Sequence, residues 1–224
     1  MEDINSTNNS NRFCTSAAAL RYPSEFRPNH FHDWIEKVAI IRALEYIPKG
    51  SNILDFPCGT GRLTTMLIEN GFNLTSADRS NEMLKAAQNN YLNLNPELLI
   101  NYSEVKFFQA DLVAGTKFTD MQFDAVVCHR LFHHLVESKT RIKALLELKR
   151  ITKKFIIFSF FNSQSCSTLI KAVKNKLKHY TPTDRLPVSK STITKEVESQ
   201  GIEVVRIISR LWGISPLCLV IAQI

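Results

Sequence analysis

The sequence contains few residues of the kinds that define secreted, zinc-stabilised or membrane-spanning proteins. Its 224 residues include five cysteines, an odd number without a C-x-x-C pair, which argues against a disulfide framework and a structural zinc site. No apolar run is long enough to cross a membrane as a helix. The polar stretch from Met1 to Asn11 lacks the pattern of a secretory signal. We therefore predict a cytoplasmic protein without a metal site.

Glycine is also scarce, with seven residues, and two of them stand close together at Gly59 and Gly61. The residues around this pair exclude two common phosphate-binding motifs. A dinucleotide fingerprint needs a third glycine where this chain has Thr64, and a P-loop needs Lys and Ser or Thr where it has Arg62 and Leu63. The glycine pair therefore predicts a tight turn of another kind, in which bare backbone lies against a ligand.

The residues on either side of the glycine pair predict a βαβ unit. Ile53–Phe56 is a short apolar strand, an amphipathic helix follows the turn, and residues 72–77 form a second strand that ends at Asp78. Asp55 stands inside the first strand, where a carboxylate would repel a pyrophosphate but suits a ligand with an ammonium group. S-adenosylmethionine is such a ligand, because it carries an amino group, a sulfonium and no phosphate.

Four motifs in the same order resemble those of the class I S-adenosylmethionine-dependent methyltransferases, of the type that acts on small molecules. The resemblance covers roughly residues 50–160. It is carried by I-L-D-F-P-C-G-T-G-R from Ile53, A-D-R-S-N-E-M-L from Ala77, F-Q-A-D-L from Phe108, and F-D-A-V-V-C-H from Phe123 with L-F-H-H-L from Leu131.

This resemblance implies an α/β fold with a Rossmann-like, doubly wound, seven-stranded sheet that is mostly parallel and has one antiparallel strand in a C-terminal hairpin. It implies S-adenosylmethionine as cofactor and S-adenosylhomocysteine as product. Asp78 is then expected at the ribose hydroxyls, and Asp111 with Leu112 at the adenine. Pro57 departs from the family pattern, which often has glycine there. The implied cofactor-binding residues are Asp55, Phe56, Pro57, Cys58, Gly59, Gly61, Asp78, Arg79, Met83, Asp111, Leu112 and Cys128.

Three histidines follow the fourth predicted strand and are candidates for a general base. They are His129, His133 and His134, and imidazole titrates in the range that such a base needs. In a helix, His129 and His133 would share a face, a spacing that could also bind a metal, but no carboxylate stands nearby to complete a metal site. The alternative for His129 is a wall of the cofactor pocket.

The rest of the chain predicts one domain over residues 15–224 after a disordered start at residues 1–14. Residues 30–47 have helical apolar spacing, and residues 15–47 are expected to form a lid with Tyr22, Arg27, His30 and Trp34, unless these four only pack. Further helices are expected at 81–91, 138–152, 163–178 and 191–201, the last capped by Ser191. Further strands are expected at 105–109, 122–128, 153–161, 202–209 and 215–222.

Positive charge is concentrated in the C-terminal half of the chain. The formal net charge is +7, yet residues 139–195 contain 14 Lys or Arg against Glu147 and Asp184. Two interpretations stay open: an anionic partner, or a solvated helix face. We expect residues 162–190 to form a basic segment on the acceptor side of the site.

Together these features predict methyl transfer to O or N of a small-molecule acceptor that is anionic or linked to a lipid or sugar. Contact of the basic segment with a membrane surface is a further expectation. An RNA methyltransferase is the alternative within the same fold, although the chain has C-H-R-L where an N-P-P-Y-like motif would stand. A third alternative is a regulatory protein that binds the cofactor without turnover.

Overall fold

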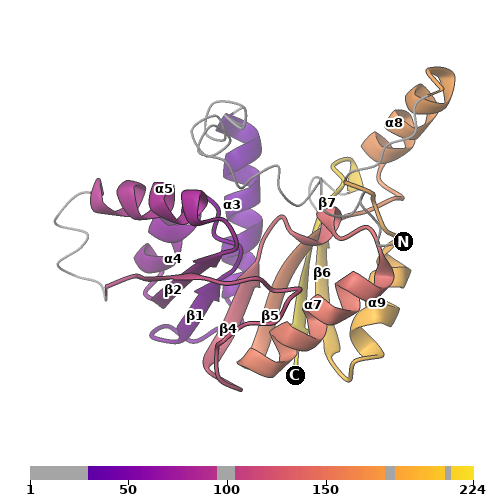
Figure 1. The fold of residues 1–224 in the computed structure, drawn as a ribbon. Helices are drawn as coiled ribbons and strands as arrows, with labels where there is room; N and C mark the ends of the chain where they lie inside the picture. The colour runs from indigo at the N-terminus through magenta and orange to yellow at the C-terminus, as the bar shows by residue number, and fades with distance from the viewer. Residues whose placement is uncertain (1–29, 95–103, 180–184, 210–212) are drawn as a thin grey trace, which may run out of the picture.

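The computed structural model describes residues 30–94, 104–179, 185–209 and 213–224, and for residues 30–33 the backbone alone (Figure 1). Within this part of the chain, seven strands form one sheet in the order β3-β2-β1-β4-β5-β7-β6. Strands β1 to β5 are parallel, and β7 is antiparallel to both of its neighbours. The strands are β1 Asn52–Asp55, β2 Asn73–Asp78, β3 Lys106–Gln109, β4 Phe123–Cys128, β5 Thr152–Phe161, β6 Glu203–Ser209 and β7 Leu217–Gln223.

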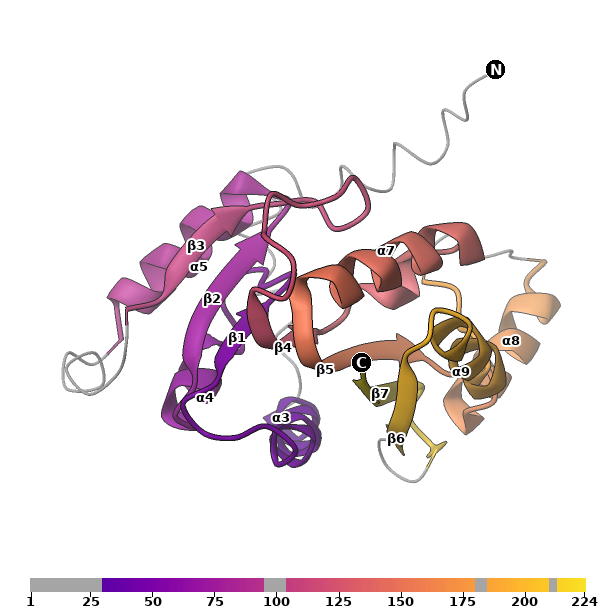
Figure 2. The ribbon, with the colours of Figure 1, turned by 90° about the horizontal axis from the view of Figure 1, so that it is seen from below.

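Helices cover both faces of this sheet, so the predicted doubly wound α/β architecture is confirmed. Helices α3 and α4 lie on one face, and α7 and α9 lie on the other (Figure 2). The helices are α3 His30–Leu44, α4 Thr64–Glu69, α5 Asn81–Leu92, α7 Ser138–Ile151, α8 Cys166–Leu177 and α9 Lys190–Glu198, and the short 3-10 helix η1 is Phe132–His134.

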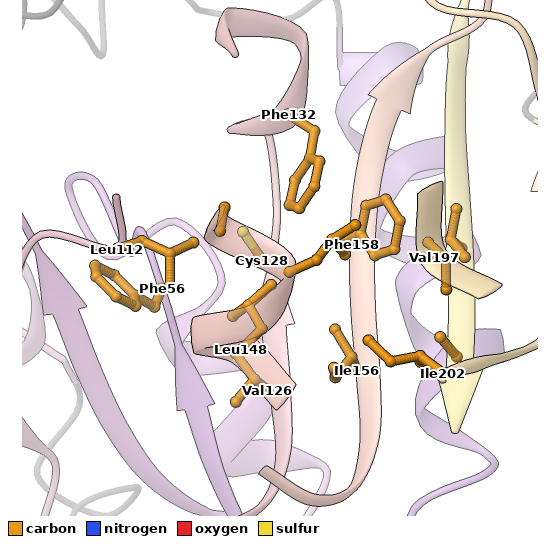
Figure 3. Packing of buried hydrophobic residues seen from close by; sticks show 14 of the residues in the cluster. Phe56, Leu112, Val126, Cys128, Phe132, Leu148, Ile156, Phe158, Val197 and Ile202 are labelled. Carbon is orange, nitrogen blue, oxygen red and sulfur yellow. The ribbon is translucent and has the colours of Figure 1, made fainter. Parts of the chain in front are cut away.

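The apolar core lies in two layers, one on each face of the sheet. Alternate side chains of a strand point to opposite faces, and β4 shows this directly. Val126 and Cys128 belong to the layer under α7 and α9, whereas Ala125 and Val127 belong to the layer under α3 and α4. Figure 3 shows the first layer, with residues from β1, β4, β5, α7 and α9 packed together. A strand that is apolar on both faces must therefore be central.

Several predicted boundaries differ from the structure. Helix α9 is capped by Ser189, whose side chain accepts a hydrogen bond from Thr192 N, so the predicted cap at Ser191 is wrong. Helix α8 begins at Cys166, three residues after the predicted start, because Ser165 caps it. The predicted disordered start at residues 1–14 and the lid candidates Tyr22 and Arg27 lie outside the described residues, as does the side chain of His30.

Candidate cofactor site

A tight glycine turn joins β1 to α4 at the edge of the sheet where the parallel strands end. Gly59 and Gly61 both have positive φ, +56° and +78°. Gly61 also lies close to α5, because a Cβ there would be 3.1 Å from Thr64 Oγ1 and 3.3 Å from Ala87 Cβ. The turn is thus restricted to glycine by its backbone at both positions and by packing at Gly61.

Asp78, the last residue of β2, fixes this turn through its carboxylate. Its Oδ2 accepts a hydrogen bond from Gly59 N at 2.9 Å, and its Oδ1 accepts one from Ser80 N at 2.8 Å. Burial raises the pKa of Asp78, while these backbone N–H groups oppose the rise. A carboxylate oxygen can accept more than one hydrogen bond. Asp78 can therefore hold the turn and still accept hydroxyl groups of a ligand.

Asp55, the last residue of β1, is a buried carboxyl group. It is 1% exposed, and neither of its oxygens has a hydrogen-bond partner among the described residues. Burial raises its pKa to about 8, with a smaller contribution from Asp78 and an opposing one from Arg62. An unpaired buried carboxyl group is costly. A cationic group placed against Asp55 would satisfy its oxygens, and the predicted role of Asp55 at an ammonium group stays a prediction.

Several other residues predicted at the cofactor are buried in the body of the protein. The side chains of Phe56, Leu112 and Cys128 pack in one core layer (Figure 3), and Met83 is buried on α5 with its backbone N–H bonded to the N-cap Ser80. The prediction that they contact the cofactor stays a prediction.

The two cysteines beside the turn are not nucleophiles in this arrangement. Cys58 and Cys128 are buried, and burial raises the pKa of both thiols, with the nearby Asp55 carboxyl raising them further. A thiol that stays protonated is a weak nucleophile. Their interpretation as small packing residues agrees with this environment.

Asp111 organises the turn after β3. Its Oδ1 accepts hydrogen bonds from Val113 N at 2.9 Å and Ala114 N at 3.2 Å, and its Oδ2 lies 3.7 Å from Arg79 Nε. The carboxylate thus shapes the backbone between residues 111 and 115, where Asp111 also bridges to Gly115. The predicted position of Asp111 at the adenine stays a prediction. The hydrogen bonds that hold this turn are by themselves a sufficient reason for an aspartate at position 111.

A buried ion-pair cluster next to the site was missed in the sequence. Glu36 of α3 is 3% exposed and receives hydrogen bonds from Arg130 Nη2 to both oxygens, at 2.7 and 2.8 Å. Arg62 Nη2 lies 3.2 Å away, and His129 Nε2 lies 3.5 Å away. Burial alone would raise the pKa of Glu36, but His129, Arg130 and Arg62 together lower it well below its usual range.

The sequence did contain a signal for this cluster. Glu36 precedes the buried Ile40 by four residues, so it shares the buried face of α3. A charged residue on such a face is almost never fully buried without a partner. The two arginines that follow the glycine pair and β4, Arg62 and Arg130, were the partners to consider.

The three histidines do not share a helix, so the predicted helical spacing of His129 and His133 is wrong. His129 follows the end of β4, and His133 lies in the 3-10 helix η1, because the chain turns before α7 begins. Burial lowers the pKa of His129 to about 4 and that of His133 well below its ordinary value. His133 stacks on Phe161 with ring centroids 4.1 Å apart and contacts His134 at 4.3 Å.

Both buried imidazoles are therefore neutral near pH 7, and the lowered pKa makes each a weaker base than a free imidazole. His133 Nδ1 and both ring nitrogens of His129 have no hydrogen-bond partner among the described residues. The two rings differ in their surroundings, because His129 Nε2 lies 3.5 Å from a carboxylate oxygen of Glu36, whereas His133 stacks on Phe161.

The described residues contain no group of three His, Cys, Asp or Glu side chains placed to hold a metal ion. They also contain no helix with the length and apolar character needed to cross a membrane.

With this geometry in view, the chain can be compared with known proteins. The family model "Methyltransferase domain" matches residues 53–154, which include the glycine turn, Asp55, Asp78, Asp111 and the three histidines. The glycine/sarcosine N-methyltransferase of Parasynechococcus marenigrum is 34% identical over 103 residues, 46% of this chain and 34% of the relative. The ubiquinone biosynthesis O-methyltransferase of Nitrosospira multiformis is 25% identical over 155 residues, 67% of this chain and 59% of the relative. The chain therefore spans less than two thirds of these relatives' length.

A solved structure supports the same fold. Magnesium protoporphyrin IX methyltransferase from Synechocystis PCC 6803, with bound SAH, has a TM-score of 0.68 at 19% sequence identity, over 86% of this chain and 83% of that chain. Residues 53–154 of the chain thus match the methyltransferase domain family, and the fold is that of methyltransferase structures solved with bound SAH or SAM.

Proposed function

We propose that this protein transfers the methyl group of S-adenosylmethionine to an oxygen or nitrogen atom of a small-molecule acceptor. The observation that carries the proposal is Asp55. Among the described residues, this buried carboxyl group has no hydrogen-bond partner, and it stands beside a glycine turn that a second carboxylate, Asp78, holds in place. S-adenosylmethionine has the two features that this pair would bind: an ammonium group and a ribose with two adjacent hydroxyls.

The residues of the chain would divide the binding of the cofactor between them. Asp55 would pair with the ammonium group, which would ionise the carboxyl and satisfy its oxygens. Asp78 would accept the ribose hydroxyls with the lone pairs that Gly59 and Ser80 leave free. The bound cofactor supplies an electrophilic methyl group, so the protein mainly has to align the acceptor and take up its proton.

His133 is the residue that we propose for taking up that proton. Its imidazole is neutral, its Nδ1 has no partner in the described chain, and its stacking on Phe161 fixes the ring plane. An acceptor with a nucleophile that is already deprotonated would not need it. The chemical nature of the acceptor therefore decides whether His133 is catalytic.

A small molecule is the proposed acceptor class for two reasons. The names of two relatives refer to glycine or sarcosine and to ubiquinone biosynthesis, which are small-molecule substrates or pathways of those proteins. In this chain, the described residues 162–179, which include four lysines, follow β5 at the same edge of the sheet as Asp55. This placement favours an acceptor with negative charge.

The proposal is tested first by calorimetric titration with S-adenosylhomocysteine and then by turnover. We expect binding by the wild type, a loss of at least tenfold in Asp78→Ala, and no change in Asp120→Ala, whose side chain is 77% exposed at the far end of β4. Turnover of S-adenosylmethionine with a panel of anionic small acceptors should then release S-adenosylhomocysteine. A folded protein that does not bind the cofactor would contradict the proposal. Binding without turnover on any acceptor, tRNA included, would favour the regulatory alternative.

A further inference from the structure

Helix α8 presents an apolar stripe that no other described part of the chain covers. None of its residues is buried. The stripe consists of Leu169, Ile170, Val173 and Leu177, and their exposed fractions are 55%, 55%, 61% and 76%. Single large aliphatic side chains at such exposure are normal. Four on one face of one helix form a contiguous apolar patch, which marks an interaction site. We call this patch the α8 stripe.

Lysines stand in a defined relation to the α8 stripe. With about 100° between successive residues of a helix, the four aliphatic residues fall within an arc of roughly 100°. Lys174 and Lys176 lie just outside the two margins of this arc, and Lys171 and Lys178 lie on the opposite face. Among the described residues, the side chain of none of these four lysines makes a hydrogen bond or an ion pair. The helix is thus amphipathic, with cationic margins.

The fold holds α8 by its first turn only. Ser165 is buried and caps the helix by accepting a hydrogen bond from Thr168 N, and Ser167 N donates to Ile214 O at 3.1 Å. From Lys171 to Leu177, no side chain makes a polar contact with the rest of the described chain. Figure 1 shows α8 projecting away from the sheet, beyond the end of β5. Because β1, β4 and β5 are parallel, this is the edge at which Asp55 and Cys128 lie.

We propose that α8 docks on an anionic membrane surface, with the α8 stripe in the interface and the lysines at the headgroups. A helix with an aliphatic face and cationic margins lies in the plane of a lipid interface, where lysine stems extend along the apolar layer and their ammonium groups reach the phosphates. Charge complementarity selects this occupant. The four lysines face no acid within the helix, since Cys166–Leu177 contains no Asp or Glu.

Two other occupants fit the helix less well. Single-stranded nucleic acid is bound through stacking on aromatic side chains, and α8 has none. A second copy of the same segment would bring eight lysines together, because each copy has three in α8 and a fourth at its C-cap, Lys178, and the two copies would repel each other. The orientation that follows for a lipid surface turns the carboxyl edge of the sheet toward the membrane. The inference is independent of the proposed function, since membrane binding needs no cofactor.

The test is flotation of the full chain with vesicles. Vesicles of phosphatidylcholine with 30% phosphatidylglycerol should carry the protein at about 0.1 M salt, vesicles of phosphatidylcholine alone should not, and about 0.5 M salt should weaken the binding. The variant Val173→Asp/Leu177→Asp should lose at least tenfold in partition. Its matched control is Leu92→Asp on α5, an apolar residue of similar exposure, 69%, which should bind like the wild type.

Charge is tested separately from apolar contact. Lys174→Gln/Lys176→Gln should lose about fivefold for each lysine near the surface. The control Lys139→Gln/Lys143→Gln removes the same charge from exposed positions on α7 and should change little. Circular dichroism establishes that all variants are folded.

Three outcomes would overturn the inference. The first is no flotation of the wild type with the anionic vesicles at low salt. The second is an equal loss in the variants and their controls, which would reduce the effect to net charge. The third is concentration-dependent self-association, or retention of tRNA, that the Val173→Asp/Leu177→Asp variant abolishes while vesicle binding is absent. That result would assign the α8 stripe to a second copy or to RNA.

Discussion

The buried carboxyl of Asp55 predicts that cofactor binding releases a proton. With a pKa of about 8, Asp55 is mostly protonated at pH 7 before binding. An ammonium group placed against it favours the ionised form. A carboxyl group that changes from this pKa to full ionisation releases about 0.9 proton at pH 7 and about 0.1 proton at pH 9. The release should therefore fall as the pH rises.

The matched variant is Asp55→Asn, which keeps the shape of the side chain and removes its proton. Titration calorimetry with S-adenosylhomocysteine in buffers of different ionisation enthalpy gives the number of protons released at saturation, so weaker binding of the variant does not bias the count. Protons that Asp78 or the amino group of the ligand releases contribute equally to the counts for the wild type and the variant. The difference between wild type and variant isolates Asp55.

The same carboxyl also sets a pH dependence of stability. Its pKa is raised on folding, so the unfolded chain ionises from about pH 4 whereas the folded chain does not until about pH 8. Between pH 5 and pH 7 the free energy of unfolding of the wild type should fall by roughly 2 to 3 kcal/mol relative to Asp55→Asn. Equal proton release in both proteins, with parallel stability curves, would refute the assignment of Asp55 as a buried, protonated group.

Three further predictions concern the surroundings of the site. Gly61→Ala should destabilise the fold by roughly 1 to 3 kcal/mol more than Gly59→Ala in urea unfolding, because both pay for positive φ but only Gly61 meets Thr64 and α5; equal losses would show that packing at Gly61 yields freely. Glu196→Gln should cost about 3 to 5 kcal/mol, because Arg141, which bonds Glu196 at 2.6 and 2.8 Å, would stay buried without its partner charge; a change in melting temperature of only a degree or two would contradict this. The imidazole of His129 should titrate by NMR near pH 4, and a midpoint above 6 would show that water reaches the ring.

Local signals in the sequence were sufficient for the sheet and for the glycine turn with the two acids at the strand ends beside it. The apolar run of β4, the glycine pair and the strand-end acids each predict their own environment without knowledge of distant residues. Parallel strands end at one edge, so Asp55 and Asp78 had to meet there once the βαβ unit was recognised. The structure adds that Asp78 is already engaged by the glycine turn.

The parts that the sequence did not predict depend on partners far away in the chain. Glu36 and Arg130 are 94 positions apart, and no periodicity within either segment refers to the other. The pair Arg141 and Glu196 is separated by 55 positions in the same way. The helical spacing assumed for His129 and His133 failed for a local reason, since the chain forms only a single 3-10 turn between β4 and α7. Spacing arguments require the helix to exist first.

The Glu36 cluster has a consequence for how the protein opens. A single carboxylate on α3 holds two guanidinium groups, one from the loop after β1 and one from the segment after β4. Detaching α3 would break the ion pairs to both arginines at once, so the helix cannot leave without releasing both loops. Amide protons of α3, the glycine turn and residues 129–131 should therefore exchange with solvent as one cooperative unit. The amide protons of the glycine turn should then exchange as slowly as those of α3, which precedes the turn in sequence and is joined to it by the ion pair of Glu36 with Arg62.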